Sequence, residues 1–113
     1  MINETSIDFY NNRLTFDYTK TKDLTTQQQD KVRTYGSQAE NLLKNKDLAF
    51  FIHQYKFEVL DQLTNIRGHS TEEDALRIAL SNELNGIDNF VSTLKRAVYY
   101  KNKIGNSEIN EAQ

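Results

Sequence analysis

One proline-free stretch, from Ser70 to Ile104, constrains the fold of this chain more than any other segment. Its apolar residues recur at steps of four, four, three, four, three and four. These steps average about 3.7 residues, close to the 3.6-residue period of an α-helix with one apolar face. The seam residues are Leu76, Leu80, Leu84, Ile87, Val91, Leu94 and Val98. The pattern predicts one helix of about 34 residues, roughly 50 Å long at 1.5 Å per residue.

Two shorter helices are expected before the long one. Thr25 or Thr26 can cap the first, which should end near Lys44. Asn45 can cap the second, which should span residues 46–66 and, as the most apolar segment, form the centre of the core. We therefore predict an all-α fold, a helical hairpin plus one long C-terminal helix in a three-helix bundle. The expected domains are an N-terminal aromatic arm (1–22), a three-helix domain (23–105) and a flexible tail (106–113).

The N-terminal arm differs in pattern from the helices. Apolar and polar residues roughly alternate on both sides of Asn11 and Asn12, which favours a short β-hairpin or an extended segment. Two strands alone are marginal in water, so the arm should cover a face of the bundle or dock on a partner. Its candidate contact residues are Phe9, Phe16 and Tyr18.

Three glycines lie within or between the predicted helices. Gly36 should weaken the first helix, because glycine costs about 1 kcal/mol relative to alanine inside a helix. Gly68 should end the second helix as a C′ residue. Gly86 indicates a close approach of another helix, and the sequence leaves open whether the long helix is continuous there.

The long helix exceeds its two partners in length. Each partner should span roughly 30 Å against about 50 Å, so a compact bundle would leave part of the long helix uncovered. The uncovered seam residues would be Val91, Leu94 and Val98. Because uncovered apolar seams mark interfaces, we expect a homo-oligomer or docking on a larger protein assembly.

No residue set resembles a catalytic or cofactor-binding site. The chain has no cysteine, which excludes disulfides and thiolate chemistry. His53 and His69 have no motif between them. The acidic run at residues 72–74 is better explained by the preference of helix starts for negative charge than by cation binding. We expect no enzymatic activity, no cofactor and no metal.

The sequence gives little reason to expect a membrane or nucleic-acid partner. The first residues have neither a basic start nor an apolar run, so we expect no signal peptide, and the apolar cluster at residues 48–52 is too short to span a bilayer. The net charge is −2. Basic and aromatic residues do mix near the end of the long helix, and such a mixture can bind phosphates and stack on bases. The basic residues there are Lys95, Arg96, Lys101 and Lys103, for which a solvated helix end is the alternative explanation.

From Ala39 to Lys103 the chain resembles small helical proteins encoded among the virion-assembly genes of tailed bacteriophages, often beside the terminase or portal genes. Their pattern is Ala-x-x-Leu-Leu, a short gap, an apolar helix, a polar loop, an acidic helix start and a long leucine-rich helix. The matching residues are Ala39, Leu42, Leu43, 50–63, 70–73 and 76–94. A tryptophan often seen in the middle helix of that family is absent, and the arm has no counterpart. The resemblance implies a non-enzymatic virion or packaging accessory, found in the cytoplasm of a bacterial host and in the virion, and it assigns no functional residues.

The sequence therefore predicts a structural or assembly protein of a bacteriophage that acts through protein–protein contacts. Two other classes stay open. One is a DNA-binding packaging or regulatory factor that uses the basic end of the last helix. The other is a small inhibitor of a host enzyme, although a net charge of −2 is far less acidic than a nucleic-acid mimic requires.

Overall fold

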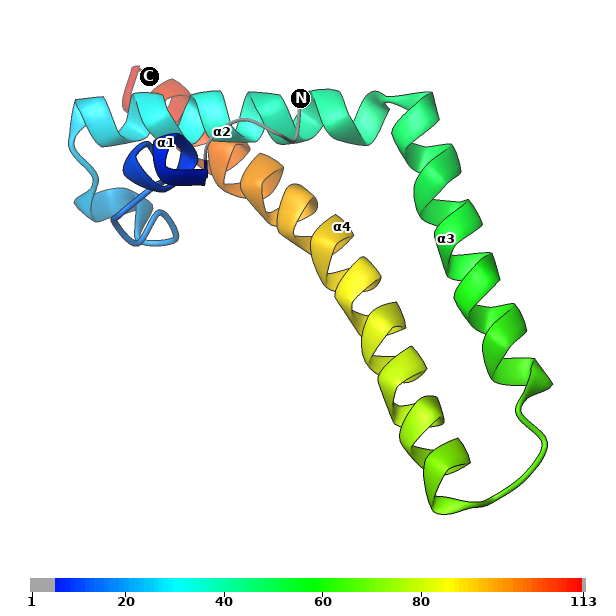
Figure 1. Cartoon of the computed structure of the whole chain (residues 1–113). Coiled ribbons are helices and arrows are strands. Elements are labelled where there is room, and N and C mark those ends of the chain that lie inside the picture. The colour runs from blue at the N-terminus through cyan, green and yellow to red at the C-terminus, as the bar shows by residue number, and fades with distance from the viewer. Residues whose placement is uncertain (1–5, 113) are drawn as a thin grey trace.

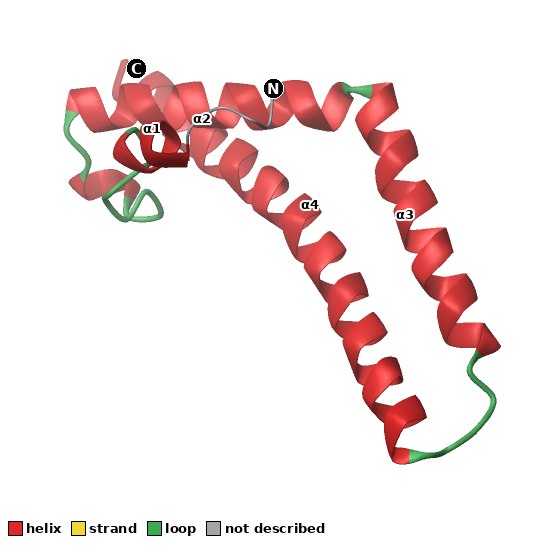
Figure 2. Ribbon diagram, viewed as in Figure 1, coloured by secondary structure: helices red, strands yellow, loops and turns green. Residues whose placement is uncertain are grey.

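The computed structural model describes residues 6–112, with side chains for residues 6–106. Its elements are α1 (Ser6–Asn11), the 3₁₀ turn η1 (Thr21–Asp23), α2 (Thr26–Lys44), α3 (Lys46–Asn65) and α4 (Thr71–Ala112) (Figure 1). Residues 6–112 contain no strand (Figure 2), which confirms the all-α class. The first five residues of the predicted arm, where a signal peptide was not expected, and the last residue of the predicted tail lie outside the described range.

The boundaries of α2 and α3 follow the predicted caps. The Thr25 hydroxyl accepts the Gln28 backbone N–H at 3.1 Å, and the Gln28 side chain accepts the Thr25 N–H at 3.0 Å, a complete capping box. The Asn45 side chain accepts two backbone N–H groups of the first turn of α3, at 2.9 and 3.0 Å. Because Asn45 alone separates the two helices, the chain turns sharply there (Figure 1).

The connection from α3 to α4 is held by the start of α4. Ser70 and Glu73 form the predicted capping box, with bonds of 3.1 and 3.2 Å. Glu73 also accepts the Gly68 backbone N–H at 2.9 Å, and the Arg77 guanidinium donates to the Gly68 carbonyl. The prediction that Gly68 is a C′ residue is wrong, because α3 ends at an extended Ile66 and the described glycines have no positive φ. Side chains of α4, rather than a left-handed glycine, bind the backbone here.

Helix α4 is a single helix of 42 residues that passes without a break through Gly86. The prediction that it ends near Gly105 is wrong, since it continues to Ala112. Glycine lowers helix propensity without removing a backbone donor as proline does, so an isolated glycine can be tolerated. At 1.5 Å per residue α4 is roughly 63 Å long, close to the 62 Å longest dimension of the molecule.

The core lies where the C-terminal half of α4 crosses α2 (Figure 1). The buried apolar residues of these two segments are Val32, Ala39, Leu94, Ala97 and Ile104. Gly36 is buried at the crossing, where a Cβ atom would lie 2.4 Å from Lys101 Cβ and 2.8 Å from the Ala97 carbonyl oxygen. Gly86, by contrast, would place a Cβ with nothing within 4 Å. The predicted close approach at Gly86 is therefore wrong, and the close approach occurs at Gly36.

Helix α3 is not the centre of the core, contrary to prediction. Val59 is its one buried apolar residue, and Phe50, Phe51 and Phe57 are 61%, 68% and 59% exposed. The reason is geometric, because α4 packs most closely on α2 and α3 lies outside that crossing (Figure 1). The radius of gyration is 19.0 Å, against about 13 Å for a compact domain of this length.

The described part of the arm begins with the helix α1 and continues without a strand to η1, so the predicted β-hairpin is wrong. Asn12 donates both its backbone N–H and its side-chain amide to the Asp8 carbonyl, at 3.2 and 2.8 Å, which closes a helical turn where a strand turn was expected. Further along, Tyr18 packs edge-on against Tyr35 of α2 and Tyr100 of α4, with ring centroids 5.7 and 5.6 Å away. This part of the arm covers one end of the α2–α4 crossing.

The two interior glycines should respond oppositely to alanine. Gly36→Ala should lower the free energy of unfolding by about 1–3 kcal/mol, because its methyl group overlaps α4. Gly86→Ala should raise it by about 0.5–1 kcal/mol, because the methyl group meets open space and the helix gains propensity. Urea denaturation followed by circular dichroism measures both, and a Gly36→Ala variant as stable as the parent would contradict the packing role of Gly36.

Candidate interaction surface

Helix α3 carries apolar side chains on both its inner and its outer face. Its inner face, which packs toward α4, includes Val59 and the half-buried Ile52 and Leu63. At about 100° per residue, Phe50 and Phe57 project roughly 160–180° away from Val59. Apolar side chains on a helix normally face a packing partner, and those on the outer face of α3 do not.

A cleft of about 770 Å³ separates α3 from α4. Phe51, Ile52 and Tyr55 line it from α3, and Gly86 and Phe90 line it from α4. Gly86 keeps this space open, because it has no side chain to fill it. One electrostatic contact crosses the cleft, since the Glu83 carboxylate beside the Tyr55 hydroxyl raises the pKa of that hydroxyl.

A second cavity of about 430 Å³ lies where α2, α3 and α4 meet. Leu43, Leu48 and Val91 line it, one from each helix. The Lys56 ammonium and the Asp88 carboxylate, 2.9 Å apart, join α3 to α4 at its edge. Together with the cleft, it leaves α3 attached to α4 by few contacts.

The predicted interface residues of the long helix are not uncovered. Leu94 is 9% exposed and belongs to the core with Ala39 and Ala97, and Val98 packs against that core. Val91 is half-buried beside the second cavity. The prediction that these residues are uncovered is wrong, because α4 crosses α2 with its C-terminal half. The end of α4 that was expected to be free is therefore the end that α2 covers. Substitution of Leu94 by aspartate would disrupt the core.

The predicted contact residues of the arm differ in exposure. Phe9 is exposed on α1, and Phe16 is half-buried in the loop that follows. Tyr18 is part of the aromatic contact with α2 and α4, and its hydroxyl accepts the Arg96 Nε–H at 3.0 Å. Of the three, Phe9 presents the largest exposed apolar side chain.

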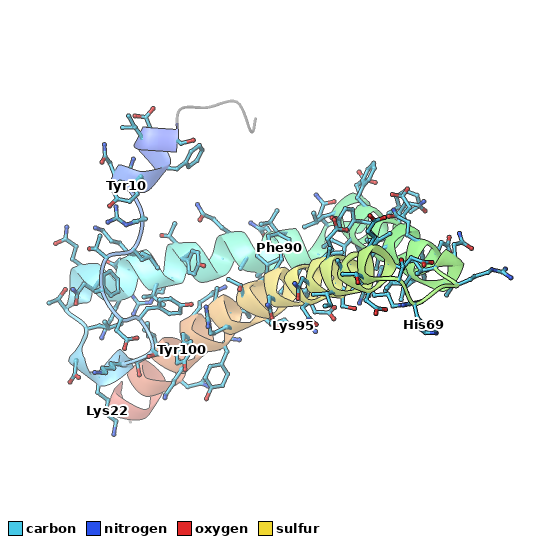
Figure 3. All side chains as sticks on the ribbon, turned by 60° about the horizontal axis from the view of Figure 1, so that its bottom comes forward. Tyr10, Lys22, His69, Phe90, Lys95 and Tyr100 are labelled. Carbon is cyan, nitrogen blue, oxygen red and sulfur yellow. The ribbon has the colours of Figure 1, made fainter. Side chains whose placement is uncertain are left out.

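The four basic residues of α4 do not form one patch. Lys101 faces α2, where its ammonium lies 2.7 Å from the Glu40 carboxylate, and its hydrogen bond is the main cause of the lowered pKa of Glu40. Arg96 binds Tyr18. Lys95 is exposed at the middle of α4 (Figure 3). The Lys103 ammonium lies 5.8 Å from the centroid of the Tyr100 ring.

The histidines and the acidic helix start have local partners. His53 stacks on Phe57 with ring centroids 6.5 Å apart, and His69 Nδ1 lies 3.5 Å from the Arg77 guanidinium. Asp74 pairs with Arg77 at 2.6 Å, and hydrogen bonds from Ser70 are the main cause of the lowered pKa of Glu73. Across the described residues, no group of three or more histidine or acidic side chains is arranged to hold a metal ion.

The exposed aromatic residues of α3 were in the sequence but were assigned to the core. The number of apolar residues in this segment could have indicated their exposure. Phe50, Phe51, Phe57 and Leu60 add apolar surface on sides of the helix that a single partner helix cannot cover. No described helix is long and apolar enough to cross a membrane. No protein-family model, no curated protein and no solved structure matches the chain.

The capping contact of Glu73 should make stability depend on pH. Its folded pKa lies below the ordinary value of 4.5, so the ionised carboxylate contributes stability above that value and loses it as pH falls through the lower, folded pKa. Glu73→Gln should therefore cost most near neutral pH, and its difference from the parent should shrink in acid. Urea denaturation across this range measures the effect, with Glu72→Gln, an exposed neighbour, as the control. A difference that is constant with pH would contradict it.

Proposed function

We propose that this chain is a non-enzymatic structural or assembly protein that works through protein–protein contacts, as a homo-oligomer. The observation that carries the proposal is the exposed aromatic surface of α3 and of the cleft beside it. Burying a phenylalanine side chain is worth about 1.5–3 kcal/mol. In a single chain Phe50, Phe51 and Phe57 stay exposed, so the free energy of burying them is not gained. Apolar surfaces of this kind mark interaction sites.

The open shape supports the same proposal. α3 and the first half of α4 extend away from the α2–α4 crossing (Figure 1). A projecting hairpin can insert into, or stack beside, other subunits without disturbing the core. The similarity of residues 39–103 to virion-assembly proteins of tailed bacteriophages supports a role as a virion or packaging accessory.

The mass in solution tests the proposal. Light scattering over a range of concentrations should give a mass above the 13.2 kDa of one chain, rising with concentration. Phe51→Lys combined with Phe57→Lys should return the monomer, because both substitutions place charge on the exposed surface of α3. Tyr99→Lys, which replaces an equally exposed aromatic residue of α4, is the matched control. A monomer at all concentrations would contradict self-assembly.

A second candidate is a DNA-binding packaging or regulatory factor. Lys95, Arg96 and Lys103 lie on the exposed side of α4 with Tyr99, which favours a phosphate-binding strip. The net charge of −2, and the contact of Arg96 with Tyr18, weaken it.

DNA binding is tested by its salt dependence. If the strip contacts DNA, duplex binding at low salt should weaken with a logarithmic slope of about −3, since each phosphate contact contributes roughly −0.9. Lys95→Ala with Lys103→Ala should make that slope shallower, and Arg67→Ala, an exposed residue in the loop between α3 and α4, is the control. Absence of any shift at low salt would reject this candidate.

A further inference from the structure

The outer face of α3 carries a seam of its own. Phe50, His53, Phe57 and Leu60 follow one another at steps of three, four and three residues. These are the a and d positions of a coiled-coil heptad. All four side chains are exposed, and the His53 and Phe57 rings stack on each other. His53 lies at the edge of this face, because it also lines the second cavity. We call this set the outer seam.

Three members of the outer seam, Phe50, Phe57 and Leu60, are exposed and line neither the cleft nor the second cavity. α2 and α4 both lie on one side of α3, and the opposite side faces no other described element (Figure 1). The cleft differs in this respect, because a small approach of α3 to α4 would close it and bury Phe51 and Phe90. Burial of Phe50, Phe57 and Leu60 therefore needs a second molecule.

The residues flanking the seam indicate what that molecule is. One flank carries Asp47, Gln54 and Asp61, and the other carries Ala49, Lys56 and Leu63. The first flank is the e position of the heptad and the second flank is the g position. In a parallel two-stranded coiled coil, a g residue of one helix lies beside the e residue of the other helix whose number is five higher. Lys56 would then lie beside Asp61 of a second copy, and Ala49 beside Gln54.

The opposite orientation is disfavoured by charge. In an antiparallel pair with the same seam, each flank would lie beside the same flank of the second copy. Asp47 would then lie beside Asp61 of the second copy, and Lys56 beside Lys56 of the second copy. In the parallel pair Lys56 would bridge two carboxylates, that of Asp88 in its own chain, 2.9 Å away, and that of Asp61 in the second copy. The flank charges are thus complementary to a parallel copy of the same helix.

We infer that the outer seam is the self-association site of this protein, and that α3 of one copy packs in parallel against α3 of a second copy. This rests on the proposed self-assembly and names its surface and partner. The seam is short, about 15 Å for residues 50–60, so the pair should depend on protein concentration.

Single-cysteine variants test the orientation, because the chain has no cysteine of its own. In the parallel pair residue 57 lies beside its own counterpart, within the Cα separation of about 4.4–6.8 Å that a disulfide requires. His53→Cys and Phe57→Cys, each in the full chain, should form disulfide-linked dimers under mild oxidation. Phe51→Cys, on the cleft side and more exposed, is the control and should give a several-fold lower yield. Equal yields from all three would overturn the inference.

A mixture separates the two orientations. When His53→Cys and Phe57→Cys chains of different tag length are oxidised together, a parallel pair yields each homodimer in excess. An antiparallel pair yields mainly the heterodimer, which would overturn the parallel arrangement.

The masses in solution of Phe57→Lys and Phe51→Lys test the outer seam independently of self-assembly as such. Phe57→Lys should be monomeric where the parent associates, with unchanged helicity by circular dichroism, because residue 57 is exposed in the single chain. If Phe57→Lys still associates and Phe51→Lys does not, self-assembly stands and the outer seam is wrong. If the parent itself is monomeric at all concentrations, both are wrong. If both variants are monomeric, the disulfide yields of the single-cysteine variants distinguish the two surfaces. A several-fold higher yield from His53→Cys and Phe57→Cys than from Phe51→Cys supports the outer seam, and equal yields overturn it.

Discussion

The close crossing of α2 and α4 is the contact on which the rest of the structure depends. Gly36 and Ala97 let the two backbones approach, and a Cβ atom at residue 36 would have no room. The pairing of Lys101 with Glu40, 2.7 Å apart, and the packing of Tyr18 secure the same region. Small residues, rather than the largest apolar ones, thus decide where the core lies, because packing depends on how closely two helices can come together.

The position of α3 follows from that crossing. With α2 held on the C-terminal half of α4, the one-residue link at Asn45 turns the chain away, and α3 can pack only on the earlier half of α4. The loop after α3 is then bound by Glu73 and Arg77. Both ends of α3 are therefore anchored, while its middle is attached through few contacts, notably the ion pair of Lys56 with Asp88. An anchored but largely uncovered apolar helix is suited to binding another molecule.

The basic end of α4 and the aromatic surface of α3, the two candidate binding surfaces, differ in how far the rest of the chain occupies them. The basic end of α4 is partly occupied by internal contacts, since Lys101 binds Glu40 and Arg96 binds Tyr18. The aromatic side chains of α3 remain exposed. An exposed apolar surface favours association, whereas exposed ion pairs contribute little free energy. This contrast is why a role in protein assembly is preferred over DNA binding.

The sequence by itself determined the local structure. The starts of α2, α3 and α4 could be predicted at Thr25 or Thr26, at Asn45 and at Ser70, because a cap is made by residues within three positions of each other. The seam of α4 was also readable from its spacing, and all but Leu76 of its residues are at least half-buried. Only the tertiary structure decided which helix forms the core and which apolar face stays open. Hydrophobic content predicts that a side chain prefers burial, but the backbone approach at Gly36, set by residues 61 to 65 positions apart, determines which side chains are buried.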